Sequence, residues 1–150
     1  MQVNEVMTKD IVTINSDDTV LEACKRYNRD KIGCLLVLRA GCMAGIITER
    51  DIIKRIIIMS KDPFVTKVEE IMSKEIITIS PTADVKEAAS LMGRNEIKKL
   101  PVVSEDGKPV GIITITDIVN LVPNMLKTIA EGGDVRPNQP EEKTVPQETV

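Results

Sequence analysis

Apolar residues follow two different spacings along this chain, and the two spacings alternate. Runs rich in isoleucine and valine at 11–14 and 76–79 have the composition of short β-strands. Stretches 18–30 and 83–95 carry apolar residues three and four positions apart, which is the spacing of an amphipathic helix. Two further pairs of strands are expected, each pair joined by a turn that contains glycine. They span residues 34–38 and 43–47, and residues 100–104 and 109–113.

A helix is predicted after each pair of strands, at 49–59 and at 115–122. Proline cannot continue the interior of a helix, so Pro123 predicts that the second of these helices ends at Val122. A short helix is expected to follow at 124–131, because proline suits the first turn of a new helix. The order of elements is therefore β-α-β-β-α, twice, which predicts an α+β (mixed α/β) fold class.

Three segments of the first half recur in the second half. They are VNEVM and VEEIM, KDIVTI and KEIITI, and GIITERD and GIITITD, which begin at residues 3 and 68, 9 and 74, and 45 and 111. The spacing is 65 residues for the first two pairs and 66 for the third. Chance similarity between apolar segments would not keep so constant a register, so the chain is read as two copies of one unit.

The repeat sets the expected organisation of the chain. One copy occupies residues 1–60, a linker 61–66, the second copy 67–131, and a disordered tail 132–150. About 60 residues bury too little surface for a firm core of their own. We therefore expect the two copies to pack together about a pseudo-two-fold axis into one module.

Composition narrows the range of functions. The net charge is −3 with no basic cluster and only one tyrosine and one phenylalanine, which argues against a nucleic-acid partner. The chain has no histidine, the commonest general acid/base and metal ligand near neutral pH. Three cysteines without a CxxC pair fit a reducing compartment. No run is apolar enough for a membrane span, so we expect a cytoplasmic protein with no membrane partner.

The twice-written G-I-I-T-x-x-D motif has two interpretations. Thr48 and Thr114 each open a predicted helix, and Asp51 and Asp117 follow three residues later. Unpaired N–H groups at a helix start can bind phosphate, and a carboxylate one turn on can accept two hydrogen bonds from a ribose diol. The same T-x-x-D spacing is also close to a helix capping box, in which the aspartate only satisfies backbone N–H groups.

Taken together, the repeated motifs and the order of elements resemble the CBS domain family, whose tandem pairs are called Bateman modules. The resemblance covers roughly residues 3–122, and I-K-K-L-P-V-V at 97–103 is a further stretch typical of the family. It implies two pseudo-symmetric clefts that bind an adenosine-containing ligand: AMP, ADP, ATP, S-adenosylmethionine or sometimes NAD. The threonine and aspartate would contact phosphate and ribose, and the other copy would hold the base. The resemblance implies no required cofactor.

The resemblance assigns residues to each cleft. The first cleft would use Thr114 and Asp117 with Thr13, Ile14, Ile32, Gly33 and Leu35. The second cleft would use Thr48, Arg50 and Asp51 with Thr78, Ile79, Ile97, Lys98 and Pro101. Two cations, Arg50 and Lys98, belong to the second cleft alone, so we expect that cleft to prefer a phosphate-bearing ligand. The alternative is that both are solvated surface charges.

Three classes of function remain. The first is a non-catalytic regulatory module that senses AMP, ADP, ATP or S-adenosylmethionine and signals to an unidentified effector protein. The second is a structural dimerisation or interaction module whose clefts are vestigial or modulated by a metal. The third, an enzyme, has no supporting nucleophile–base pair, GxxxxGK[ST] loop or metal cluster in the sequence. A homodimer is expected through helices 49–59 and 115–122, whose apolar surface is wider than one core-facing stripe requires.

Overall fold

The computed structural model describes residues 1–123. The helix expected at 124–131 and the tail expected at 132–150 lie outside these residues. Residues 1–119 form one compact unit. Within the described part of the chain, no helix has the length and apolar character that crossing a membrane requires.

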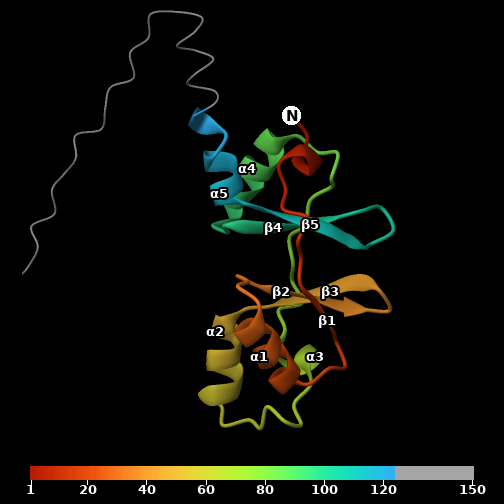
Figure 1. The fold of residues 1–150 in the computed structure, drawn as a ribbon, viewed down its shortest axis with the longest axis vertical. Helices are drawn as coiled ribbons and strands as arrows, with labels where there is room; N and C mark the ends of the chain where they lie inside the picture. Colours follow the sequence, from red (N-terminus) through yellow and green to blue (C-terminus); the bar gives the residue numbers. More distant parts are fainter. Residues whose placement is uncertain (124–150) are drawn as a thin grey trace, which may run out of the picture. The chain divides into compact units, whose positions relative to one another are not determined.

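The first half of the chain builds a three-stranded sheet. Its order is β1 (Thr13–Asn15), β2 (Leu35–Arg39), β3 (Cys42–Ile47), with β1 parallel and β3 antiparallel to β2. The helices α1 (Val20–Arg29) and α2 (Glu49–Ile52) lie on one side of this sheet in Figure 1. A π-helical turn, Ile53–Ile57, continues α2.

The second half builds a smaller sheet with a similar set of helices. It contains β4 (Lys99–Val103) paired antiparallel with β5 (Pro109–Thr114), together with α4 (Val85–Asn95) and α5 (Ile115–Val119). The α+β fold class is confirmed, and the hairpin strands and the two long helices lie within two residues of their predicted positions. The last helix differs: it ends at Val119 rather than Val122, because Asn120, a residue that favours turns, begins a turn there.

The strand predicted at 76–79 is wrong, because only Ile79 pairs, in a single parallel bridge to Val102. Two prolines explain the difference from the first half. In the first sheet the N–H of Ser16 donates to the carbonyl of Leu38 at 2.8 Å, and the N–H of Leu36 donates to that of Val12 at 3.2 Å. The corresponding positions 65 residues later are Pro81 and Pro101, which have no N–H to donate. The ladder is therefore cut on both sides of Ile79.

The first residues of each sequence copy are buried in the hydrophobic core formed by the other copy. A short helix, α3 (Val68–Ile71), lies at the start of the second sequence copy, yet Val68, Ile71 and Met72 are buried in the core of the first half. In the same way Val3, in a 3₁₀ turn Val3–Glu5, is buried in the core of the second half. Backbone hydrogen bonds repeat this exchange, from Val68 N to Asp18 O and from Val3 N to Ala83 O, both at 2.8 Å.

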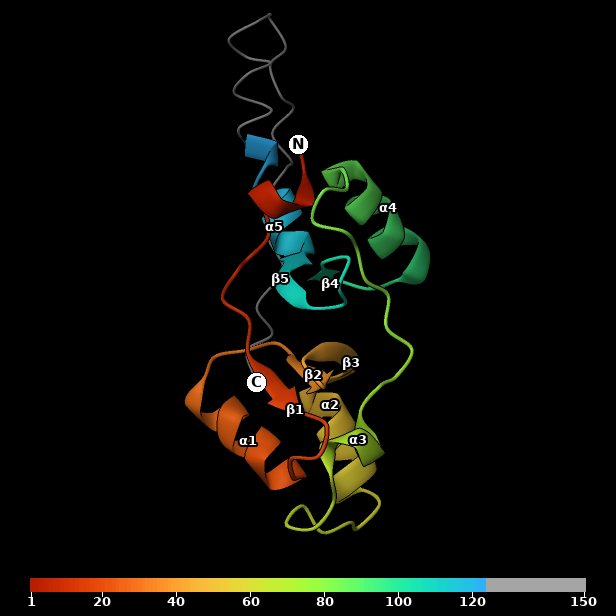
Figure 2. The same cartoon turned by 90° about the vertical axis from the view of Figure 1, so that its right-hand side faces the viewer.

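Because the openings are exchanged, the chain crosses between the two sheets twice. Residues 9–12 lead from the second sheet to β1, and residues 74–78 lead from α3 toward α4, on opposite sides in Figure 2. Just before each crossing the chain forms an antiparallel β-bridge with a strand of the other sequence copy. Thr8 pairs with Ile112, and Ser73 pairs with Ile46.

The motif glycines are needed where these segments pass. A Cβ atom on Gly45 would lie 2.8 Å from the carbonyl oxygen of Ser73, and one on Gly111 would lie 2.9 Å from that of Thr8. Real Cβ atoms do not approach backbone oxygens so closely, so glycine fits these positions because another backbone passes over it. Met72 and Met7, which the notional Cβ atoms would also meet, pack with the hydrophobic cores.

Candidate functional site

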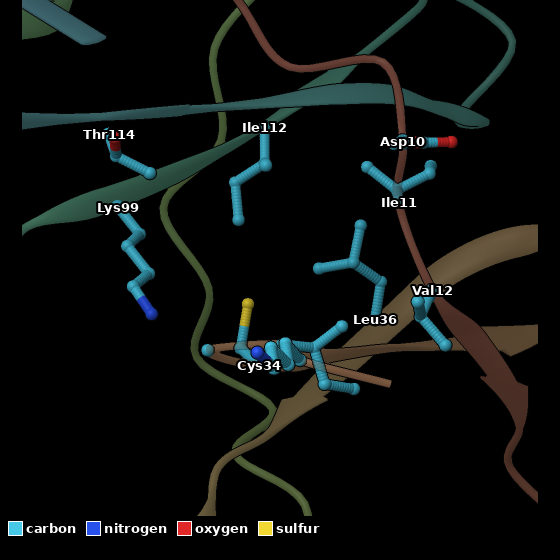
Figure 3. Close-up of a pocket in the computed structure, with 11 residues that line it drawn as sticks. Asp10, Ile11, Val12, Cys34, Leu36, Lys99, Ile112 and Thr114 are labelled. Carbon is cyan, nitrogen blue, oxygen red and sulfur yellow. The ribbon is translucent and has the colours of Figure 1, made fainter. Parts of the chain in front are cut away.

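Two clefts lie beside the crossing segments, and each is lined by residues from both sequence copies. The first cleft has a volume of about 150 Å³ and is lined by Asp10, Ile11, Val12, Lys31, Ile32, Gly33, Cys34, Leu36, Lys99, Ile112 and Thr114 (Figure 3). The second has a volume of about 220 Å³ and is lined by Ile46, Thr48, Asp51, Ser73, Glu75, Ile76, Ile77, Ile97, Lys99 and Pro101. Most of these residues correspond in pairs, 65 or 66 positions apart.

Both clefts are smaller than the roughly 300 Å³ at which pockets for drug-sized ligands begin. An entire nucleotide therefore fits only with its outer part in solvent, or after side chains move. Their walls are largely aliphatic, with isoleucines from the crossing segments on one side and from β3 or β5 on the other. Such walls can enclose a flat heterocycle between apolar side chains.

The T-x-x-D motif is a capping box in both copies. Asp51 Oδ2 accepts hydrogen bonds from the N–H of Thr48 at 2.9 Å and from its hydroxyl at 3.0 Å, and the Thr48 hydroxyl accepts from the N–H of Asp51 at 3.3 Å. Asp117 and Thr114 repeat this geometry at 2.9, 3.0 and 3.2 Å. Among the hydrogen bonds of residues 1–123, Oδ1 of neither carboxylate takes part, so each aspartate keeps one oxygen for another partner.

The structure brings some of the expected first-cleft residues together. Ile32, Gly33 and Thr114 line that cleft. Ile14 and Leu35 are buried in the hydrophobic core instead. Thr13 lies in β1 and Asp117 in α5, and neither belongs to the lining.

The second cleft is similar. Thr48, Asp51, Ile97 and Pro101 line it, whereas the expected residues Thr78, Ile79, Lys98 and Arg50 do not. Ile79 is buried in the core of the second half, and the other three are exposed. The expectation that this cleft prefers phosphate rested on Arg50 and Lys98, so the structure gives it no support.

Three of the lining residues that sequence reasoning missed, Cys34, Leu36 and Lys99, follow a simple rule. The second cleft takes every second residue at the entry to β4: Ile97, Lys99 and Pro101. The first cleft takes their counterparts Ile32, Cys34 and Leu36, together with Lys31 and Gly33. Side chains of a strand alternate between its two faces, so this period of two was readable from the sequence. Leu35 and Lys98, at the alternate positions, line neither cleft: Leu35 is buried in the core and Lys98 is exposed.

Charge differs between the clefts. The first contains one carboxylate, Asp10, and two lysines, Lys31 and Lys99, whereas the second contains two carboxylates, Asp51 and Glu75, and only Lys99. Burial raises the pKa of the Cys34 thiol in the first cleft, and the nearby Lys99 ammonium partly opposes that increase. Within the described residues, no group of three or more His, Cys, Asp or Glu side chains is placed to hold a metal ion.

Comparison with solved structures identifies similar domain pairs. The CBS domain pair of protein MJ0100, solved in complex with 5′-methylthioadenosine and S-adenosyl-L-methionine, is 30% identical, with a TM-score of 0.72 over 83% of this chain and 98% of that one. The cytosolic domain of the Mg²⁺ channel MgtE, solved in complex with ATP, is 28% identical, with a TM-score of 0.69 over 80% of this chain. The match spans 48% of the MgtE chain, so it concerns only part of that protein.

Sequence comparison agrees. An uncharacterized protein of Methanopyrus kandleri, MK0525, is 33% identical over 132 residues, which cover 87% of this chain and 67% of that protein. The CBS domain profile matches residues 3–58 and again residues 68–124. Two matches over most of the chain, together with the similarity to solved CBS pairs, show that this chain is a tandem member of the CBS domain family.

Proposed function

We propose that this chain is a non-catalytic regulatory module that binds an adenosine-containing ligand, most readily AMP, ADP or ATP, in the clefts between its two halves. Ligand binding would change how the halves pack, and an effector protein would respond to that change. CBS pairs are regulatory modules, and solved relatives contain ATP or S-adenosylmethionine and 5′-methylthioadenosine.

The observation that carries the proposal is that each cleft is composite. In the second cleft, Thr48 and Asp51 come from the first copy, and Ile97 and Pro101 come from the second copy. A ligand that contacts both sets bridges the halves, and its binding energy depends on how they are arranged. Composite construction is what a module needs if ligand binding is to bias a conformational equilibrium.

The free oxygen of Asp51, which lines the second cleft, supports the choice of a ribose-bearing ligand. Asp51 Oδ2 is committed to Thr48, which fixes the carboxylate and leaves Oδ1 to accept hydrogen bonds. A carboxylate held in one rotamer by its own cap loses little conformational entropy when a ribose hydroxyl binds it. Capping and ligand binding are therefore compatible roles for the same residue.

Isothermal titration calorimetry of protein freed of bound ligand, with AMP, ATP and S-adenosylmethionine, tests the proposal. Asp51→Asn and Asp117→Asn are the decisive variants, because asparagine keeps an oxygen for the cap but accepts fewer and weaker hydrogen bonds. We expect each variant to weaken one site about tenfold and to change the free energy of unfolding by less than about 1 kcal/mol. Folded protein that binds none of the three ligands would contradict the proposal and favour an interaction scaffold.

S-adenosylmethionine is the second candidate ligand, and the charge of the second cleft favours it there. Asp51 and Glu75 outnumber the single lysine, Lys99, so a sulfonium cation is better matched than a phosphate. If this candidate is correct, S-adenosylmethionine should bind more tightly than its neutral product 5′-methylthioadenosine, and Glu75→Gln should reduce that difference. Equal reduction of both affinities would instead indicate a general loss of packing.

A further inference from the structure

One lysine belongs to both clefts. Lys99, the first residue of β4, lines the first cleft together with Cys34 and the second cleft together with Ile97. Figure 3 shows its side chain extending from the second sheet toward the loop that carries Cys34. No ion pair within residues 1–123 involves Lys99, so its ammonium is not committed to a protein carboxylate there.

A glycine makes the present position of Lys99 possible. The Lys99 Nζ atom occupies the place where a Cβ atom on Gly33 would lie. Any other residue at position 33 would have to displace the ammonium from its present position. The end of a lysine side chain is flexible, so such displacement would redirect the charge rather than unfold the protein.

This arrangement is asymmetric, because the two sequence copies differ at the positions involved. The counterpart of Lys99 in the first copy, 65 residues earlier, is Cys34, and the counterpart of Gly33 in the second copy is Lys98, which is exposed and lines neither cleft. A symmetric pair would supply one cation to each cleft from the opposite copy. Here the position that would send a cation into the second cleft is a neutral thiol.

We propose that Lys99 is a shared phosphate-recognising residue that makes the two clefts antagonistic toward anionic ligands. This inference rests on the proposed function, because it assumes that adenosine ligands enter the clefts. The Lys99 ammonium lies beside Gly33, which lines only the first cleft. A charge-assisted hydrogen bond requires about 2.7–2.9 Å, so the side chain has to move to reach a phosphate in the second cleft. The first anionic ligand binds the Lys99 ammonium in one cleft. The second ligand then enters the other cleft, where this ammonium is no longer available.

Calorimetric titration with AMP and with adenosine separates this antagonism from any intrinsic difference between the clefts. Adenosine has no phosphate, so the ratio of its two dissociation constants measures the part of the difference between the clefts that does not depend on a phosphate. We expect that ratio to be about tenfold or more larger for AMP, the value of one lost charged hydrogen bond. In Lys99→Met the AMP ratio should fall about tenfold toward the adenosine ratio. Any remaining difference reflects the fixed charges, Lys31 in the first cleft and Asp51 and Glu75 in the second. The exposed Lys86→Met, on α4, should behave like the natural protein.

Two further variants move or add the charge. Cys34→Lys supplies the missing symmetric cation and should tighten the second AMP about tenfold. Gly33→Ala should displace the Lys99 ammonium and weaken AMP protection of Cys34 from alkylation, while Gly93→Ala, where a Cβ atom meets nothing within 4 Å, should not. Thermal unfolding verifies that each variant is folded.

The outcomes distinguish this inference from the proposed function. If AMP and adenosine bind but give equal ratios, or if the larger AMP ratio is undiminished in Lys99→Met, the shared-lysine inference is wrong and the proposed function stands. If neither compound nor S-adenosylmethionine binds to folded, ligand-free protein, the proposed function fails and this inference fails with it.

Discussion

Tyr27, the single tyrosine of the chain, connects α1 to the residue that precedes the T-x-x-D motif. Its hydroxyl donates to the carbonyl oxygen of Ile47 at 2.7 Å, and its ring packs against the core of the first half. Burial is the main cause that raises the pKa of Tyr27 well above its ordinary value, and the nearby Cys34 adds to it. The hydroxyl is therefore held as a neutral donor at the end of β3, next to the second cleft.

Replacing Tyr27 with phenylalanine should lower the free energy of unfolding by about 1 kcal/mol near neutral pH, the value of one net hydrogen bond. A raised pKa in the folded state means that this contribution is complete below about pH 10, the unfolded value, and is lost as pH rises toward the folded value. Urea unfolding at pH 8 and pH 11 should therefore show a steeper loss of stability for the natural protein than for Tyr27→Phe. Parallel losses would show that the phenol is not held in its neutral form.

Two glycines, Gly111 of the repeated motif and Gly93 of α4, allow a prediction about the packing of the crossing segment. Gly111→Ala should destabilise the protein by about 1–3 kcal/mol, because the added methyl group meets the carbonyl of Thr8 and the side chain of Met7. Gly93→Ala, in the interior of α4 with open space around it, should be neutral or stabilising by up to about 1 kcal/mol. Chemical denaturation measures both, and similar effects would show that the crossing segment is not tightly packed on Gly111.

At the scale of elements, periodicity and turn residues were sufficient for most of the fold. Helices α1 and α4 and the two hairpins appear where the apolar spacing and the glycine turns put them. The strand expected at 76–79 fails for a reason that the sequence contained, since Pro81 and Pro101 cannot donate to the ladder. Only some of the cleft residues were predicted. The alternation of side chains along a strand would have selected Lys99 rather than Lys98 as a residue of the second cleft.

The exchange of opening segments could not be read from the sequence. Residues 3–7 and 68–72 match each other, but nothing in an apolar pattern says in which of two similar cores a valine will be buried. Long-range backbone pairing decides it: Val68 joins the first half through Asp18, and Val3 joins the second through Ala83. A boundary drawn from sequence similarity therefore differs from the boundary of each hydrophobic core.

Two fragments of similar length test the exchange. Fragment 1–60 is the first sequence copy and lacks α3, whereas fragment 9–73 contains every buried residue of the first core, from Ile14 to Met72. We expect fragment 9–73 to show the stronger helical circular dichroism and a weakly cooperative melt, and fragment 1–60 to be largely unfolded. Both are near the size at which a domain is only marginally stable, so the missing α3 should decide the outcome. Equal folding of the two fragments would contradict the importance of the exchange.

At the scale of the whole molecule, unusually apolar helix surface is left uncovered. Ile57 and Ile58, at the end of the α2 segment, are 66% and 69% exposed, and Val119 on α5 is 56% exposed. Neither hydrophobic core includes these side chains. Exposed apolar side chains of this kind mark an interaction site, and identical surfaces on two copies of a chain favour a two-fold dimer.

We therefore expect the protein to be a dimer in solution, and Ile57→Glu to convert it to a monomer without loss of fold. A buried glutamate at a two-fold contact faces its own copy, so two desolvated charges would repel each other. Lys54→Glu changes the charge of the same exposed turn without removing apolar surface and is the matched control. Light scattering coupled to size-exclusion chromatography should give twice the chain mass of 16.5 kDa for the natural protein and for Lys54→Glu, and the chain mass for Ile57→Glu. A dimer that persists in Ile57→Glu would show that association uses another surface, and a monomeric natural protein would leave this apolar surface for a different partner.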